Sequence, residues 1–90
     1  MSKETSTEQV NYVAELMDSV IEDSSVPRNI RKALDDAKHK ILGQEKMDVA
    51  ITSAIYILDD ISNDINMPSH ARTEIWQIIS ELETIREKSK

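Results

Sequence analysis

Two histidines and two pairs of neighbouring aspartates are the residues whose types could support acid–base or metal chemistry. They are His39, His70, Asp35–Asp36 and Asp59–Asp60. Neither histidine has the spacing to a second ligand that defines a helical metal motif such as H-E-x-x-H. Adjacent helical residues diverge by about 100°, so neither aspartate pair is a preformed chelate. We therefore predict solvated positions for His39 and both pairs, and His70 with Glu74 is only a weak metal candidate.

Other common catalytic arrangements lack their residues. Cysteine is absent, which excludes a Cys nucleophile, a thiolate metal site and disulfides. The single glycine, Gly43, cannot build a phosphate-binding loop, and no Ser–His–Asp arrangement is evident in the sequence. The E-x-x-H pairs of ferritin-like di-iron bundles are also missing. We expect no enzymatic activity, no cofactor and no bound metal.

A basic stretch is the first candidate for an interaction surface. Residues 28–40 hold five cations against two carboxylates, a local charge of +3 in a chain of net charge −6. The cations are Arg28, Arg31, Lys32, Lys38 and Lys40. They either complement the acidic first helix or meet RNA or an acidic protein, although no aromatic residues are interleaved for base stacking.

Trp76 is the second candidate. It is the only tryptophan, and only Tyr12 and Tyr56 join it as aromatic residues. It either fills a gap in the core or forms a partly exposed anchor of the kind found at protein interfaces. The candidate interaction residues are therefore Arg28, Lys32, Lys38, His70 and Trp76.

A nine-residue pattern occurs twice and predicts two helix-to-helix turns. Residues 23–31 read D-S-S-V-P-R-N-I-R, and residues 64–72 read D-I-N-M-P-S-H-A-R, 41 positions later. The shared residues are Asp23, Pro27 and Arg31 in the first copy and Asp64, Pro68 and Arg72 in the second. We expect the aspartates to accept N–H groups at the start of the next helix. Each arginine should reach back to that carboxylate or to carbonyls that end the previous helix.

Apolar residues at spacings of three and four predict four helices around these turns. The first helix should follow a Ser6 cap with Gln9 and run to Glu22, and the second should begin at Pro27 and end at a left-handed Gly43. The third should cover 48–63 and be the most buried, and the fourth should run from Pro68 to Lys88. The predicted core positions are Val10, Val13, Ala14, Met17, Val20, Ile21, Ile30, Ala33, Leu34, Ala37, Ile41, Val49, Ala50, Ile51, Ala54, Ile55, Ile57, Leu58, Ile61, Ala71, Ile75, Ile78, Ile79, Leu82 and Ile85.

The 41-residue offset also aligns core positions, which indicates two pseudo-repeated helical hairpins at about 7–42 and 48–88. The period and the turn resemble those of a HEAT repeat, but two units are too few for a solenoid. We predict an all-α fold in which residues 1–90 form one domain, a four-helix up-and-down bundle. Residues 1–5 and 89–90 should be loose.

The turn sequences S-V-P-R-N-I-R and N-M-P-S-H-A-R-T-E-I-W-Q-I-I-S resemble those of a small archaeal family of about ninety-residue helical proteins, known only as an uncharacterised protein family (a UPF class). The resemblance extends from about Glu8 to Arg86. It implies a four-helix bundle in a cytoplasmic archaeal protein, and it implies no catalytic residue, cofactor or established partner.

The charge and the polar N-terminus complete these expectations. A net charge of −6 opposes strong nonspecific binding to nucleic acid or anionic membrane. No apolar run is long enough to span a bilayer and no secretory leader is evident, so the expected location is the cytoplasm.

We expect a protein-interaction or self-associating accessory module, as a homo-oligomer or with a protein partner. The alternative is an RNA- or nucleic-acid-associated factor that uses the basic face of the second helix.

Overall fold

The computed structural model describes the backbone of residues 2–88 and the side chains of residues 8–88. They form four helices, α1 (Ser2–Ile21), α2 (Arg28–Leu42), α3 (Met47–Ile61) and α4 (Ser69–Lys88). The all-α prediction is confirmed. The expected looseness of residues 1 and 89–90 falls outside the described residues.

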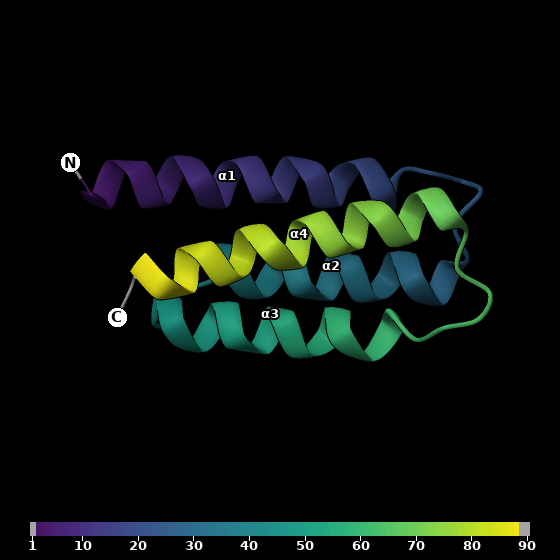
Figure 1. Cartoon of the computed structure of the whole chain (residues 1–90). Coiled ribbons are helices and arrows are strands. Elements are labelled where there is room, and N and C mark those ends of the chain that lie inside the picture. The colour runs from purple at the N-terminus through teal and green to yellow at the C-terminus, as the bar shows by residue number, and fades with distance from the viewer. Residues whose placement is uncertain (1, 89–90) are drawn as a thin grey trace.

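The helices pack as a ring in which each contacts two neighbours. α1 packs against α2 and α4, and α3 packs against the same two helices. Within residues 2–88, no Cα pair across either diagonal comes within 8 Å. Figure 1 shows successive helices running in opposite directions, with the α1–α2 and α3–α4 turns at one end and both termini at the other. The bundle measures 39 × 20 × 19 Å.

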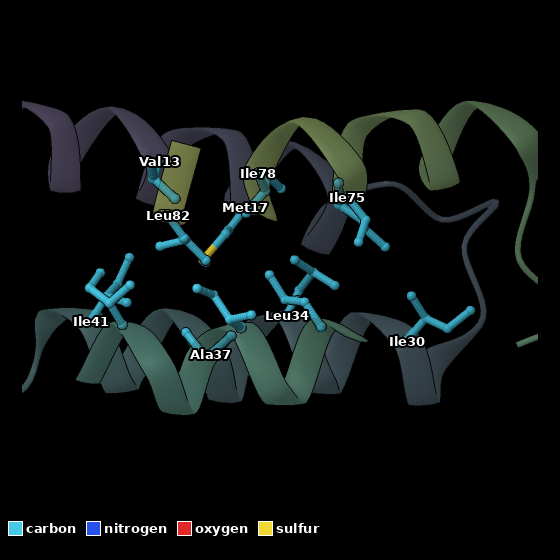
Figure 2. Packing of buried hydrophobic residues seen from close by; sticks show 14 of the residues in the cluster. Val13, Met17, Ile30, Leu34, Ala37, Ile41, Ile75, Ile78 and Leu82 are labelled. Carbon is cyan, nitrogen blue, oxygen red and sulfur yellow. The ribbon is translucent and has the colours of Figure 1, made fainter. Parts of the chain in front are cut away.

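The core between the helices is aliphatic. Val13, Met17, Leu34, Ile51 and Leu58 each expose 0% of their surface. Full burial of such a side chain contributes about 1.5–3 kcal/mol. Figure 2 shows residues of α1 and α4 pointing toward residues of α2, namely Val13, Met17, Ile75, Ile78 and Leu82 toward Ile30, Leu34, Ala37 and Ile41.

Most predicted core positions are buried, and the turns add two more. Val26 exposes 1% and Met67 6% of its surface, and both belong to the same cluster as the helical core residues. Each precedes a proline, which holds the chain extended so that the side chain turns inward. These two residues close the core at the end that carries both turns.

The observed helix starts differ from the predicted ones. α1 begins at Ser2, because no proline or glycine interrupts residues 2–9, so Ser6 lies inside the helix and cannot cap it. Gln9 therefore has no capping role, and its Oε1 is buried without a hydrogen-bond partner among the described residues. Pro27 has ψ of 148°, so it occupies the cap position before α2 instead of the first helical position.

Gly43 does not adopt the left-handed conformation expected after α2. Its φ is −78° and its ψ is −166°, so the chain leaves the helix extended, and its N–H donates to the Lys40 carbonyl. A Cβ at this position would lie 3.2 Å from the His39 carbonyl oxygen. Close approach to the end of α2, and not a positive φ, is therefore the structural use of this glycine.

In agreement with the prediction, α3 buries a larger share of its residues than α2 or α4: five of 15, against four of 15 in α2 and five of 20 in α4. Part of its predicted apolar face is nevertheless exposed. Val49 exposes 46% and Tyr56 70% of its surface, while Ile57 and Ile61 are only partly buried. The apolar stripe of α3 is wider than the strip covered by α2 and α4, so it continues onto the surface.

No helix among residues 2–88 is long and apolar enough to cross a membrane.

Candidate functional site

The end of the bundle that carries both turns gathers most of the polar contacts between distant parts of the chain. We call residues 22–29 and 62–70 the turn end (Figure 1). In the first turn, Asp23 Oδ1 accepts the Ser25 N–H at 2.9 Å and the Ser25 hydroxyl at 2.6 Å. The Val26 N–H donates to the Asp23 carbonyl at 3.1 Å. Asp23 therefore closes the turn instead of capping the helix that follows.

The second turn has the same local geometry. Asp64 Oδ1 accepts the Asn66 N–H at 2.8 Å, and the Met67 N–H donates to the Asp64 carbonyl at 3.2 Å. The expectation that these aspartates satisfy the first N–H groups of the next helix is wrong for both. Their carboxylates bind the residue two positions later, which leaves Oδ2 of each free to face the other turn.

Two hydrogen bonds join the turns. His70, in the first turn of α4, places Nε2 2.9 Å from Asp23 Oδ2. Asn29, in the first turn of α2, donates through Nδ2 to Asp64 Oδ2 at 3.0 Å. Each aspartate therefore holds the first turn of a helix in the opposite half of the chain. His70, which the sequence offered only as a weak metal candidate with Glu74, contacts Asp23.

The arginines shared by the two turn patterns bind backbone carbonyls. Arg31 Nε donates to the Val26 carbonyl at 3.0 Å. Arg72 donates to the Ser62 carbonyl at 2.6 Å and to the Asp64 carbonyl at 3.1 Å. Two roles were predicted for these arginines. Arg72 fills one of them, because it contacts carbonyls at the end of the previous helix. The other role, a hydrogen bond to the aspartate of the same turn, is formed by neither Arg31 nor Arg72.

The structure brings Ser25, His70 and Asp23 together, an arrangement that the sequence analysis did not predict. Ser25 Oγ lies 3.3 Å from His70 Nε2, the same nitrogen that faces Asp23. A nucleophilic triad needs the carboxylate on one ring nitrogen and the serine on the other. Here the Ser25 hydroxyl donates its proton to Asp23, and Nε2 carries the proton in its contact with the carboxylate. The cluster is therefore a set of structural hydrogen bonds without an activated serine.

These contacts lower the pKa of both aspartates. Hydrogen bonds from the Ser25 side chain, His70 and the Ser25 backbone lower the pKa of Asp23 from 3.8 to about 2. The Asn66 backbone N–H, the Asn29 amide and the charge of Arg72 lower the pKa of Asp64. Donors of this kind stabilise the ionised carboxylate. Both carboxylates are therefore held as acceptors at neutral pH and are unsuited to supply a proton.

The basic face of α2 is partly neutralised within the molecule. Lys38 Nζ lies 2.6 Å from Asp18 of α1, and this contact raises the pKa of Lys38. Lys32 lies 3.6 Å from Asp36, one turn along the same helix. Arg28, Arg31 and Lys32 line an open surface depression of about 410 Å³ together with Ile21 and Asp35.

His39 lies on the surface, as predicted. Its Nδ1 is 2.8 Å from the Asp35 carbonyl oxygen of its own helix, and its side chain is 75% exposed. Within residues 8–88, whose side chains the structure describes, no three or more histidine, aspartate or glutamate side chains lie where they could hold a metal ion.

All three aromatic side chains of the chain are exposed. Trp76 exposes 57%, Tyr56 70% and Tyr12 47% of its surface. The interpretation of Trp76 as a core residue is therefore wrong, because the space between the helices is already filled by aliphatic side chains. Sequence reasoning also missed Tyr56, whose position opposite the buried face of α3 was the available signal.

The sequence and the fold both match proteins of one family. The uncharacterised protein family UPF0147 matches residues 1–85. The chain belongs to the UPF0147 family. A UPF0147 protein of Methanocaldococcus jannaschii is 49% identical over 87 residues, covering 94% of this chain and 92% of the relative. One from Methanothermobacter thermautotrophicus is 50% identical over 84 residues, covering 91% and 81%.

Two crystal structures share the arrangement of helices. The protein MMP1188, described as of unknown function, superposes with a TM-score of 0.85 at 44% identity and covers 87% of this chain and 90% of its own. A UPF0147 protein from Thermoplasma acidophilum gives a TM-score of 0.83 at 36% identity, with 88% and 94% covered. The resemblance to an archaeal uncharacterised family is confirmed. These two proteins thus share the four-helix arrangement of this chain.

Proposed function

We propose that this UPF0147 protein is a non-enzymatic accessory module that binds another protein or a second copy of itself. The observation that carries the proposal is the exposure of Trp76 together with Tyr56 and Tyr12, in a chain whose core contains no aromatic residue. Tryptophan and tyrosine bury large areas and are enriched among residues that dominate binding energy at interfaces. Residues that the fold does not need in its core are available for a partner.

The turn end supports a structural role in place of catalysis. Asp23 and Asp64 accept hydrogen bonds, the Ser25 hydroxyl donates to Asp23, and Arg31 and Arg72, just beyond the two turns, donate to backbone carbonyls. These side chains are therefore engaged in holding the turns together. Lowered aspartate pKa values also occur in structural networks, so they do not require a catalytic function.

The contacts across the turn end also support the proposal that the bundle consists of two pseudo-repeated hairpins. Asp23 and Asp64 are separated by the 41-residue offset, and so are Asn29 and His70. The hydrogen bond from Asn29 to Asp64 therefore corresponds to the one from His70 to Asp23. In this proposal the domain, residues 1–90, arose as two related halves that bind each other reciprocally.

The alternative function, RNA binding through α2, has less support. Of its predicted contact residues, Lys38 is paired with Asp18 and Lys32 lies near Asp36, which leaves Arg28 as the one without a described ion pair. RNA binding predicts an affinity that falls steeply with salt and is reduced by Lys32→Glu. Absence of RNA binding at low salt would remove this alternative.

The test of the proposed function compares the wild-type protein with Trp76→Ser and Tyr56→Ser in affinity purification from the source organism, followed by mass spectrometry. We expect one or more proteins, or further copies of the chain, to be retained by wild type and lost from both variants. Gln77→Ser, an exposed change beside Trp76, is the matched control and should keep the partner. Equal retention by all four proteins would contradict the proposal.

A further inference from the structure

The neighbouring helices α3 and α4 each contain a stretch without charge. Residues 49–58 of α3 and 75–80 of α4 contain no Asp, Glu, Lys or Arg, in a chain in which 31% of residues are charged. Within these stretches Val49, Tyr56, Trp76, Gln77 and Ser80 are exposed. Depletion of charge around exposed aromatic side chains is typical of the centre of a protein interface.

Tyr56 and Trp76 lie at similar heights on these two neighbouring helices. α3 packs against α4 and runs in the opposite direction, with the turn of residues 62–68 between them (Figure 1). Tyr56 is five residues before the end of α3 at Ile61, and Trp76 is seven residues after the start of α4 at Ser69. At 1.5 Å per residue these separations are about 8 and 11 Å from the turn. One partner segment can therefore contact both aromatic side chains.

The margin of this surface is acidic along α3. α3 carries Asp48, Asp59 and Asp60, all exposed, and no lysine or arginine. Glu83 is exposed on α4, and the cations Arg86 and Lys88 follow it in the last turn of that helix. The cation nearest in sequence to Trp76 is Arg72, whose guanidinium is engaged by the Ser62 and Asp64 carbonyls. A partner must therefore bring positive charge to the rim and apolar groups to the centre.

We propose that the α3–α4 surface binds a basic amphipathic segment of a different protein, with lysine or arginine side chains that meet Asp48, Asp59, Asp60 and Glu83 and contact the rings of Tyr56 and Trp76. This inference rests on the proposed function and specifies its partner. Arginine and lysine cations interact favourably with the faces of tryptophan and tyrosine rings. The same cations of a partner can therefore contact both the aromatic centre and the acidic rim.

A second copy of the chain fits this surface poorly. A two-fold dimer through the surface brings the acidic margins of the two copies together, and like charges in contact oppose association. The basic α2 of another copy would form a head-to-tail contact that does not close. Two of its cations, Lys38 and Lys32, already lie beside Asp18 and Asp36.

The test uses two synthetic 18-residue helical peptides with identical leucine positions, one with lysine and arginine and one with glutamate at all polar positions. Binding to the full chain is followed by the fluorescence of Trp76, the only tryptophan, and by amide chemical shifts. We expect the basic peptide to bind, to shift Trp76 emission to shorter wavelength and to perturb α3 and α4. The acidic peptide should not bind.

Two variants that each remove three negative charges distinguish binding at this site from general attraction of a basic peptide to an acidic protein. Changing Asp48, Asp59 and Asp60 together to asparagine should weaken binding of the basic peptide at least tenfold. Changing Glu8 and Glu15 of α1, and Glu22 directly after it, together to glutamine removes the same charge and should weaken binding less than threefold. Trp76→Ser, followed by chemical shifts, should weaken it at least tenfold.

Equal effects of the two triple variants, or no binding of the basic peptide at low salt, would overturn the inference. If light scattering instead shows a dimer that Trp76→Ser abolishes, the proposed function stands and the basic partner is wrong. If Trp76→Ser and Tyr56→Ser alter neither peptide binding nor association between copies, both the inference and the proposed function fail.

Discussion

At the scale of single residues, Asp23 links the stability of the bundle to pH. Its pKa in the folded protein is about 2, below the value of about 4 expected for an unfolded aspartate. A lowered folded-state pKa stabilises the fold above the unfolded value, and this stabilisation is lost as the pH falls from about 4 to about 2. The lowered pKa of Asp64 acts in the same direction.

We therefore predict that the free energy of unfolding of wild type falls over this acidic range and that Asp23→Asn reduces the fall. Asparagine still accepts the Ser25 N–H, so the turn keeps its shape while the titrating group is removed. Urea denaturation at pH values between 2 and 7 measures the effect. Asp60→Asn, on the exposed surface of α3, is the control and should keep the wild-type decline. An unchanged decline in Asp23→Asn would refute the role of this residue.

Single-residue roles were predictable where they depend on local sequence. The repeated Asp, Pro and Arg indicated the two turns, and both turns are present. The partner of His70 was not predictable, because Asp23 is 47 positions away and only the closed bundle brings them to 2.9 Å. Likewise, the exposure of Trp76 depends on whether aliphatic side chains alone fill the core. The spacing of apolar residues along the helices does not show this.

At the scale of elements, the apolar spacing predicted the helices and most of their buried faces. Leu34 and Ile75 occupy central positions of the predicted stripes and expose 0% of their surface. The wrong predictions concern the edge of one apolar face and the start of one helix, where the spacing of apolar residues is less informative. Val49 fits the apolar stripe of α3 but lies outside the strip that α2 and α4 cover, and the start of α1 has a cap-like sequence without a helix break.

Substitutions at buried positions should therefore lower the free energy of unfolding more than substitutions at exposed positions. We predict that Ile75→Val lowers the free energy of unfolding by about 0.5–1.5 kcal/mol and Leu34→Ala by about 2–5 kcal/mol. Tyr56→Ser and Trp76→Ser should change it by less than about 0.5 kcal/mol, because both side chains are exposed. Chemical denaturation followed by circular dichroism provides all four values. A loss of more than about 2 kcal/mol in Trp76→Ser would mean that this residue supports the fold and would weaken its assignment to an interface.

At the scale of the whole molecule, neither hairpin buries its apolar face alone. α1 needs α4 as well as α2, and α3 needs α2 as well as α4. The buried residues of all four helices form one cluster, which Val26 and Met67 close at the turn end. Half of a 90-residue chain is too small to hold a stable core without a partner. The bundle is therefore expected to fold as one cooperative unit.

This dependence predicts the behaviour of the chain when it is divided between α2 and α3. Fragments 1–44 and 45–90 should each show little helix by circular dichroism, and an equimolar mixture should regain the helical signal of the intact chain. Asn29→Ala in the first fragment or His70→Ala in the second removes one hydrogen bond across the turn end, so each should weaken reassembly by about 2- to 10-fold, corresponding to about 0.5–1.5 kcal/mol. Gln77→Ala, exposed on α4, should leave reassembly unchanged. A cooperative unfolding transition in either fragment alone would show that a single hairpin suffices, and the two halves would then be independent units joined by a turn instead of one reciprocal core.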